Sequence, residues 1–111
     1  MSTLKNKVQL IGRLGNDPEV KNFESGKTMA TFSMATNEIY YNSKGEKVED
    51  TQWHNVVAWG KKVSIIESYL KKGSEVAIEG KLVNRKYDKE GETRYVTEIS
   101  LHELLMMNKK D

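Results

Sequence analysis

The fold of this 111-residue chain is decided by residues 51–73, which read TQWHNVVAWGKKVSIIESYLKKG. The first part of this stretch alternates its side chains with a period of two, as in a β-strand with one buried face. Val56 and Ala58 form the apolar row, and the opposite row consists of Trp53, Asn55, Val57 and Trp59. We therefore predict a strand over residues 51–59 that carries two tryptophans on one face.

The second part of the stretch changes to a helical period after Gly60. Its apolar residues follow a single stripe, made by Val63, Ile66 and Leu70. Gly73 is a natural stop, because glycine adopts the left-handed conformation that often follows the last helical turn. A short helix over residues 61–72 is predicted.

Four other stretches alternate like strands: residues 5–14, 27–38, 74–87 and 93–102. The expected buried rows of the first three are Val8, Leu10, Gly12 and Leu14; Ala30, Phe32 and Met34; and Val76, Ile78, Gly80 and Leu82. Gly80 lies in mid-strand, which predicts a bulge or sharp bend there. Polar turn sequences lie at residues 15–18, 43–45 and 88–91, and the last of these separates the final two strands.

The predicted order is therefore three strands, one helix and two strands. Long strands bent by glycines, with a helix between the third and fourth, are typical of a five-stranded Greek-key barrel of the OB type. We predict this all-β OB-fold. An SH3-like barrel or a small open sheet with one helix would also fit the order of elements.

The composition places only weak limits on function. The chain has 18 basic and 16 acidic residues, a net charge of +2 that is typical of an ordinary solvated surface. It has no cysteine, so it has no disulfide or thiolate metal site. Residues 1–7 lack the apolar core of a secretory signal, and no apolar run is long enough to span a membrane. We expect a cytoplasmic protein.

No pattern of catalytic residues is present. His54 and His102 have no metal-ligand spacing, and neither a nucleophile elbow nor a phosphate-binding glycine loop occurs. The carboxylates are dispersed among lysines. We therefore expect no enzymatic activity, no metal and no cofactor, and we interpret His54 as a structural or interface residue.

The aromatic residues indicate a binding function. Trp53 and Trp59 share a strand face with Asn55, Tyr87 shares one with Lys81 and Arg85, and Tyr40 ends the second predicted strand. Flat rings among basic and polar groups can stack nucleic-acid bases of any sequence while the cations bind phosphates. The alternative is that the tryptophans belong to the core, where tryptophan is more often found.

Ordered sequence blocks resemble the bacterial single-stranded DNA-binding protein family over residues 6–101. The blocks are NKVQLIGRLGNDPEV at 6–20, FSMATNE at 32–38, TQWHNVV at 51–57, YLKKGSEV at 69–76, IEGKL at 78–82 and RKY at 85–87. The resemblance implies a sequence-tolerant protein that coats and protects unpaired DNA during replication, recombination and repair. It further implies a protein associated with the nucleoid.

The resemblance also implies which residues stack on bases: Tyr40, Trp53, Trp59 and Tyr87. Compared with the enterobacterial pattern, Tyr87 replaces a tryptophan and Trp59 replaces a phenylalanine, so all positions remain aromatic. The basic residues on or beside the strands that carry these rings are predicted to contact phosphates: Lys7, Arg13, Lys61, Lys62, Lys81, Arg85 and Lys86.

Family members typically form homotetramers, which implies subunit contacts near the first strand and His54. The implied interface residues are Asn6, Val8, Leu10 and His54. The first strand, whose outward face is polar, could also pair edge to edge with a second copy, because an isolated strand edge must be covered.

The end of the chain departs from the family. Members usually carry a long tail with an acidic, aromatic tip that recruits replication enzymes, whereas this chain ends in NKKD at 108–111. We expect an OB-fold domain over residues 1–103 and a short end over 104–111 without tail-mediated recruitment. The chain is either truncated or a tailless form.

Two other functions fit the same residues. An RNA chaperone or replication-restart accessory would use the same rings and cations, and OB-folds also serve as protein-assembly modules. The four aromatic residues argue against the assembly module. Only a competition titration between DNA and RNA separates the two nucleic-acid functions.

Overall fold

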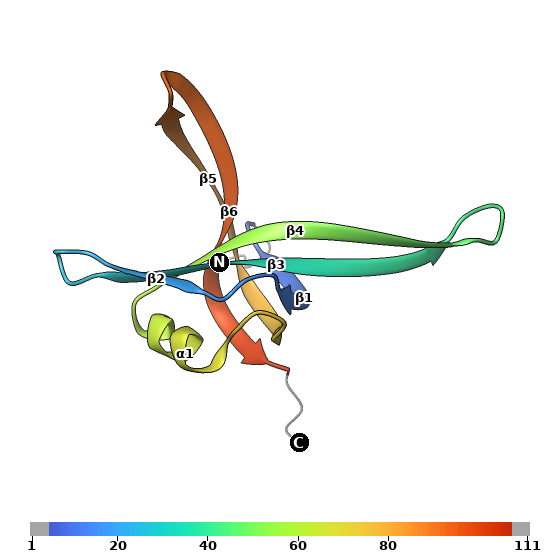
Figure 1. Cartoon of the computed structure of the whole chain (residues 1–111), viewed down its shortest axis with the longest axis horizontal. Coiled ribbons are helices and arrows are strands. Elements are labelled where there is room, and N and C mark those ends of the chain that lie inside the picture. Colours follow the sequence, from blue (N-terminus) through green and yellow to red (C-terminus); the bar gives the residue numbers. More distant parts are fainter. Residues whose placement is uncertain (1–4, 108–111) are drawn as a thin grey trace.

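The computed structural model describes residues 5–107, which form strands and one short helix (Figure 1). The elements are β1 (Val8–Leu14), β2 (Glu19–Asn22), β3 (Thr28–Tyr41), β4 (Lys47–Trp59), α1 (Lys61–Tyr69), β5 (Glu75–Lys89) and β6 (Glu92–Met106). In this part of the chain no helix is long and apolar enough to cross a membrane.

The strands close into a barrel. Their order is β1-β5-β6-β4-β3-β2, and β1 also pairs with β3, which joins the two sides of the sheet. A short parallel contact, Val56 with Ile99 and Val57 with Ser100, links β4 to β6. Five strands therefore form the predicted OB-type barrel, with α1 between the third and fourth of them, and the prediction of fold class is confirmed.

Two glycines allow the strands to approach closely where the barrel closes. A Cβ on Gly12 would collide with the carbonyl oxygen of Ala35 on β3, and one on Gly80 would collide with the carbonyl oxygen of Ser100 on β6. The β5–β6 register also shifts between Glu79 and Gly80. The predicted bulge at Gly80 is thus confirmed, and its physical reason is backbone contact across the sheet.

The core consists of the inward rows of the strands and the inner stripe of α1. Its members are Leu14, Ala30, Phe32, Met34, Val56, Ala58, Val63, Ile66, Leu70, Val76, Ile78 and Ile99. Leu82, which was predicted to be buried, is instead 47% exposed. The pairing of β1 with β5 ends at Gly80, so among residues 5–107 no strand covers Leu82 on that side.

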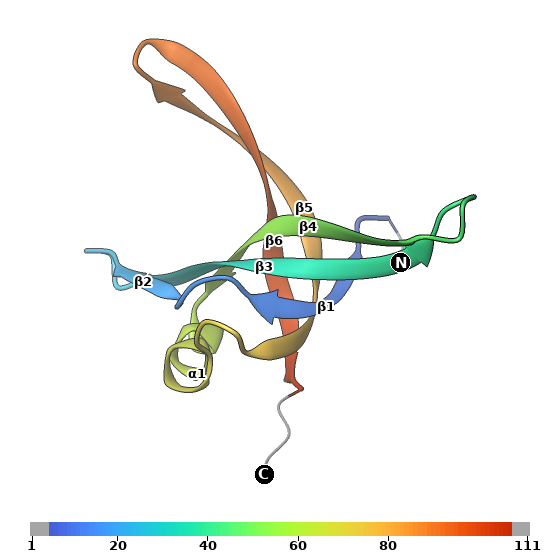
Figure 2. The same ribbon diagram turned by 45° about the vertical axis from the view of Figure 1, so that its right-hand side comes forward.

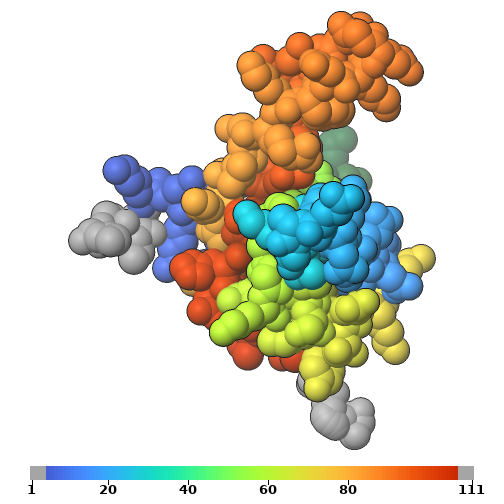
Figure 3. Space-filling model, turned by 90° about the vertical axis from the view of Figure 1, so that its left-hand side faces the viewer, coloured from blue at the N-terminus to red at the C-terminus, as the bar shows by residue number. Residues whose placement is uncertain are grey.

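The outer parts of three hairpins extend beyond the barrel (Figures 1 and 2). The β3–β4 hairpin extends to its turn at residues 42–46, and the β5–β6 hairpin forms an arm that stands clear of the body (Figure 3). The β2–β3 hairpin contains a strand, β2, that the sequence pattern did not predict. Its four residues are too few to show a period.

Some boundaries differ from those predicted. The helix ends at Tyr69 rather than at residue 72, because Leu70 has an extended backbone with φ −104° and ψ 144°. The strand β6 runs through Met106, so the sheet continues past the expected domain boundary at 103. The remainder of the expected short end, residues 108–111, lies outside the described residues.

Candidate nucleic-acid interface

The outer face of the β3–β4 ribbon carries both tryptophans. The register places Ala35 opposite Trp53, Ser33 opposite Asn55, and Met29 opposite Trp59. Directly paired residues share a face, so these side chains form one continuous surface. Trp53 is 62% exposed and Trp59 is 48% exposed, whereas Val56 and Ala58 of the inward row are buried. Both indole rings are therefore available to a ligand.

Trp53 is held in place from one side by the β1–β2 loop. A Cβ on Gly15 would overlap the six-membered part of the Trp53 ring, with Cη2 only 2.9 Å away. The ring therefore packs on the backbone of Gly15. The adjacent Asn16 side chain accepts hydrogen bonds from the backbone N–H and the hydroxyl of Ser33, each 2.9 Å long, which fixes the loop against β3.

A groove separates this aromatic face from the β5–β6 arm. One hollow of about 410 Å³ lies between Trp59 and Val57 on one side and Val83, Arg85 and Glu98 on the other. A second hollow of about 330 Å³ shares Arg85 and Glu98 and is lined on its far side by Asn55 and Ser33. The two hollows follow the tryptophan-bearing face of β4.

Arg85 is bound to an acidic neighbour in this groove. Its Nε and terminal amino groups donate hydrogen bonds of 3.2 and 2.6 Å to the carboxylate of Glu98, whose side chain is 15% exposed. The hydrogen bond with Glu98, and then its Coulomb attraction, raises the pKa of Arg85 above the usual value. A phosphate that contacts Arg85 must therefore share it with Glu98.

The register divides the arm residues between its two faces. Lys81, Arg85 and Tyr87 alternate with Leu82 and Lys86 along β5. Tyr87 thus shares the groove face with Arg85, as expected from the sequence. Lys86 is paired with Tyr95 on the opposite face of the arm, away from Arg85.

Tyr40 is exposed but lies on the other pleat face of the β3–β4 ribbon. It pairs with Val48, five positions from the pair of Ala35 with Trp53, and an odd separation changes the face. The neighbouring Tyr41, which pairs with Lys47, shares the pleat face of Trp53. The stacking role of Tyr40 therefore stays a prediction, and Tyr41 is a second exposed ring near the same turn.

The other side chains predicted to contact phosphates differ in their position relative to the two tryptophans. Arg13 pairs with Ala35 and so continues the row of Trp53, although it also contacts Glu75 at 3.7 Å. Lys61 and Lys62 begin α1, directly after Trp59 and Gly60. Lys7 immediately precedes β1, at the other end of that strand from Arg13, and contacts Glu79 at 3.8 Å.

The predicted interface residues all have contacts within the chain. Asn6 exchanges two hydrogen bonds with the backbone of Leu82, of 2.9 and 3.1 Å. Val8 and Leu10 pack against the core from β1, and the His54 ring lies 3.1 Å from the hydroxyl of Thr36. Among residues 5–107, no group of histidine and acidic side chains is arranged to hold a metal ion.

Three residues of this surface were missed by the sequence reasoning. Lys21 lines the groove beside Trp59, Glu98 binds Arg85, and the ring of Phe23 stacks on Trp59. Phe23 carried a signal, because an apolar ring within the polar turn sequence NFESGK has no strand row to join. The sequence contained no signal for Glu98, because its pairing with Arg85 depends on the β5–β6 register.

A closed OB-type barrel with an exposed aromatic face along a groove defines a protein of the oligonucleotide-binding class. The model of the single-strand binding protein family matches residues 5–107. This chain belongs to that family.

Curated relatives and solved structures agree with this assignment. The chain is 47% identical over 108 residues to single-stranded DNA-binding protein 1 of Chlorobaculum tepidum, covering 96% of this chain and 67% of the relative. It is 44% identical to single-stranded DNA-binding protein 1 of Xylella fastidiosa, covering 95% of this chain and 79% of the relative. A protein of Neisseria meningitidis with the same family name is also 44% identical, but the match covers only 59% of its length and 92% of this chain.

The fold matches two solved structures. A Plasmodium falciparum SSB in complex with single-stranded DNA is 34% identical with a TM-score of 0.85, covering 97% of this chain and 99% of that one. A deletion mutant of the single-stranded DNA binding protein of Thermus aquaticus has a TM-score of 0.81 and covers 93% of this chain and 50% of that one. At 23% identity, the second comparison shows the shared fold alone.

Proposed function

We propose that this chain binds single-stranded DNA with little sequence preference and coats unpaired strands during replication, recombination and repair, in the cytoplasm and on the nucleoid. The observation that carries the proposal is the pair of exposed tryptophans on one face of β4, aligned along a groove. The function is binding and requires no reaction or cofactor. Related proteins that are named for single-stranded DNA binding support it.

Base stacking would supply most of the affinity. Each stacked base contributes about 1–3 kcal/mol, and every base has a flat face, so the contact tolerates any sequence. In this proposal Trp53, Trp59 and Tyr87 receive bases on the groove face, and Tyr40 receives one near the β3–β4 turn. Duplex DNA cannot use this surface, because its bases are already stacked on one another.

Phosphate contacts would contribute less to the binding free energy than they do in a strongly basic protein. The net charge is only +2, and three of the proposed phosphate-binding cations, Lys7, Arg13 and Arg85, have carboxylate neighbours. Lys61, Lys62, Lys81 and Lys86 complete the proposed set. Since log K falls by about 0.7 per log unit of salt for each phosphate neutralised on a single strand, a shallow salt dependence is expected.

Titration of tryptophan fluorescence with oligo-dT and oligo-U tests the proposal. Stacking of bases on Trp53 and Trp59 should quench their fluorescence. In competition, oligo-dT should displace bound oligo-U. Tighter binding of oligo-U would favour an RNA chaperone. Absence of quenching with both would leave a protein-assembly module and overturn the proposal.

We also propose that the chain forms a homo-oligomer and that this oligomer is a tetramer. Within residues 5–107, the edge of β1 that faces β3 is paired only at Arg13 and Leu14, and Gly12 lies against Ala35, which leaves residues 8–11 free to pair with a second copy. In this proposal Asn6, Val8, Leu10 and His54 lie near the contact.

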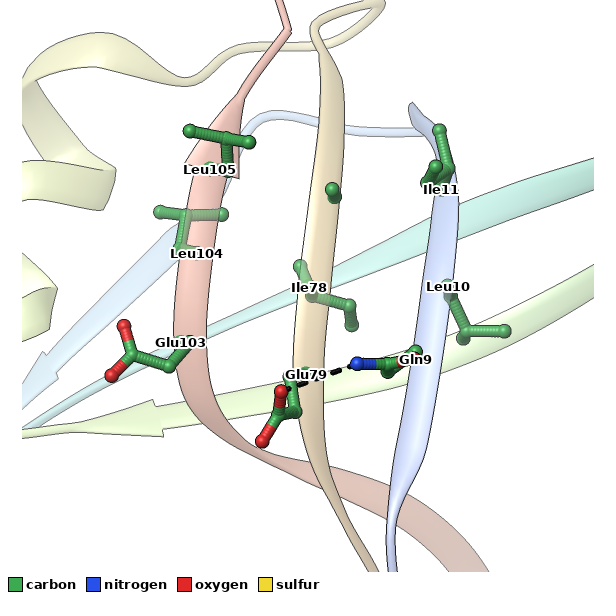
Figure 4. A pocket seen from close by; sticks show the side chains of 9 residues that line it. Gln9, Leu10, Ile11, Ile78, Glu79, Glu103, Leu104 and Leu105 are labelled. Atoms are coloured by element: carbon green, nitrogen blue, oxygen red, sulfur yellow. Dashed lines mark hydrogen bonds between the residues drawn. The ribbon is translucent and has the colours of Figure 1, made fainter.

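An apolar row on the outer face of the β1-β5-β6 sheet supports a second contact. Ile11, Ala77 and Leu105 lie directly beside one another across the three strands, and Ile11 and Leu105 are well exposed. They border a hollow of about 740 Å³, shown with Gln9, Glu79 and Glu103 in Figure 4. Light scattering at micromolar concentration should give a tetramer mass, and a monomer would exclude the assembly.

A further inference from the structure

The β2–β3 turn holds one phenylalanine in a defined position outside the core. The Phe23 N–H donates to the Lys27 carbonyl oxygen and the Gly26 N–H donates to the Phe23 carbonyl oxygen, both at 2.9 Å. These bonds close the turn over residues 23–27. Both backbone groups of Phe23 are therefore hydrogen-bonded within the turn, although its side chain is absent from the core cluster and 41% exposed.

The Phe23 ring stacks on Trp59. The ring centroids are 5.9 Å apart with an angle of 24° between the planes. This is an offset stack of the kind aromatic pairs prefer, and each ring keeps one face that its partner does not cover. A base cannot enter between the rings without separating them, because two stacking distances total about 7 Å. An additional base would therefore use the outer face of Phe23.

Cations flank the ring pair. Lys21 shares a row with Met29 and Trp59, and it lines the groove on the side of Trp59. Lys27 lines a separate hollow of about 420 Å³, which Trp59 borders together with Gly60. Trp59 thus lies between the groove and a second hollow, with one lysine in each lining.

We infer that Phe23 is a further stacking residue, and that the DNA strand leaves the groove over Trp59 and crosses the β2–β3 turn. One base stacks on the outer face of Phe23, and the phosphates on either side of it contact Lys21 and Lys27. The inference rests on the proposed function, and it lengthens the binding path by a site that the tryptophans and tyrosines do not include.

Anisotropy titration with labelled oligo-dT of increasing length tests this path. Phe23→Ala should weaken binding about 5- to 150-fold for oligonucleotides long enough to reach the turn, and leave the shortest binding lengths unchanged. Phe23→Tyr should retain the affinity, whereas Phe23→Leu, which keeps a large apolar side chain but has no π-face, should not. Tyr69→Ala removes a still more exposed ring, on α1, and serves as the control.

Photocrosslinking provides a readout that a purely structural role would not change. Oligo-dT with a single 5-iodouracil near one end should crosslink to Phe23 in the wild type, and moving the probe to the centre should transfer the crosslink to other rings. Equal losses at every length, full rescue by Phe23→Leu, or no crosslink at Phe23 would each overturn the inference. Failure of the wild type to bind oligo-dT would instead overturn the proposed function.

Discussion

Replacing Gly15 by alanine should weaken DNA binding without removing any binding residue. The added methyl group would overlap the Trp53 ring and lie 3.1 Å from the Ser33 hydroxyl. Gly15 is not among the residues with positive φ, so alanine suits its backbone and the effect is purely steric. The Trp53 ring must therefore leave its position over the loop.

The size of the effect follows from the exposure of the ring. Overpacking a core costs about 1–3 kcal/mol, but Trp53 is 62% exposed and can turn into solvent, so the free energy of unfolding should fall by about 1 kcal/mol or less. Loss of one stacked base should cost about 1–3 kcal/mol of binding free energy, or roughly 5- to 150-fold in affinity.

A double-mutant cycle with Trp53→Ala isolates this mechanism. If Gly15 acts only through the ring, Gly15→Ala should have almost no further effect on oligo-dT affinity in the Trp53→Ala background. Gly45→Ala is the control, since Gly45 has a φ of 79° and, among the described residues, no atom within 4 Å of an added Cβ. This variant should lower the stability of the fold and leave the affinity for DNA unchanged. Additive losses of affinity in the double variant would refute the reasoning.

Three other predictions concern the groove. Trp53→Ala should lower affinity by about 1–3 kcal/mol while thermal unfolding changes little; a large loss of stability with normal binding would place the ring in the core instead. Lys81→Ala should make the slope of log K against log salt shallower by about 0.7, and an unchanged slope would remove Lys81 from the phosphate path. Glu98→Gln should steepen the same slope by up to about 0.7, because it releases Arg85 to a phosphate; weaker binding in this variant would show that Glu98 serves to position Arg85.

Local alternation in the sequence determined the strand faces of the barrel and the face that carries Trp53 and Trp59. It also predicted the helix stripe and the bend at Gly80. These features depend on residues a few positions apart, whose relative direction follows from the period of a strand or helix. The order of elements and the matching sequence blocks were then sufficient for the OB-fold.

Only the tertiary structure decided which residues from different strands and loops contact one another. Three contacts join segments far apart in the chain: Arg85 with Glu98, the Trp53 ring with Gly15, and the Phe23 ring with Trp59. The exposure of Leu82 likewise depends on where a distant strand ends. Such contacts are set by strand register and barrel closure, and a shift of one residue in register would move every side chain to the other face. The period of a strand determines its two faces, but the partners across the sheet depend on how the whole barrel packs.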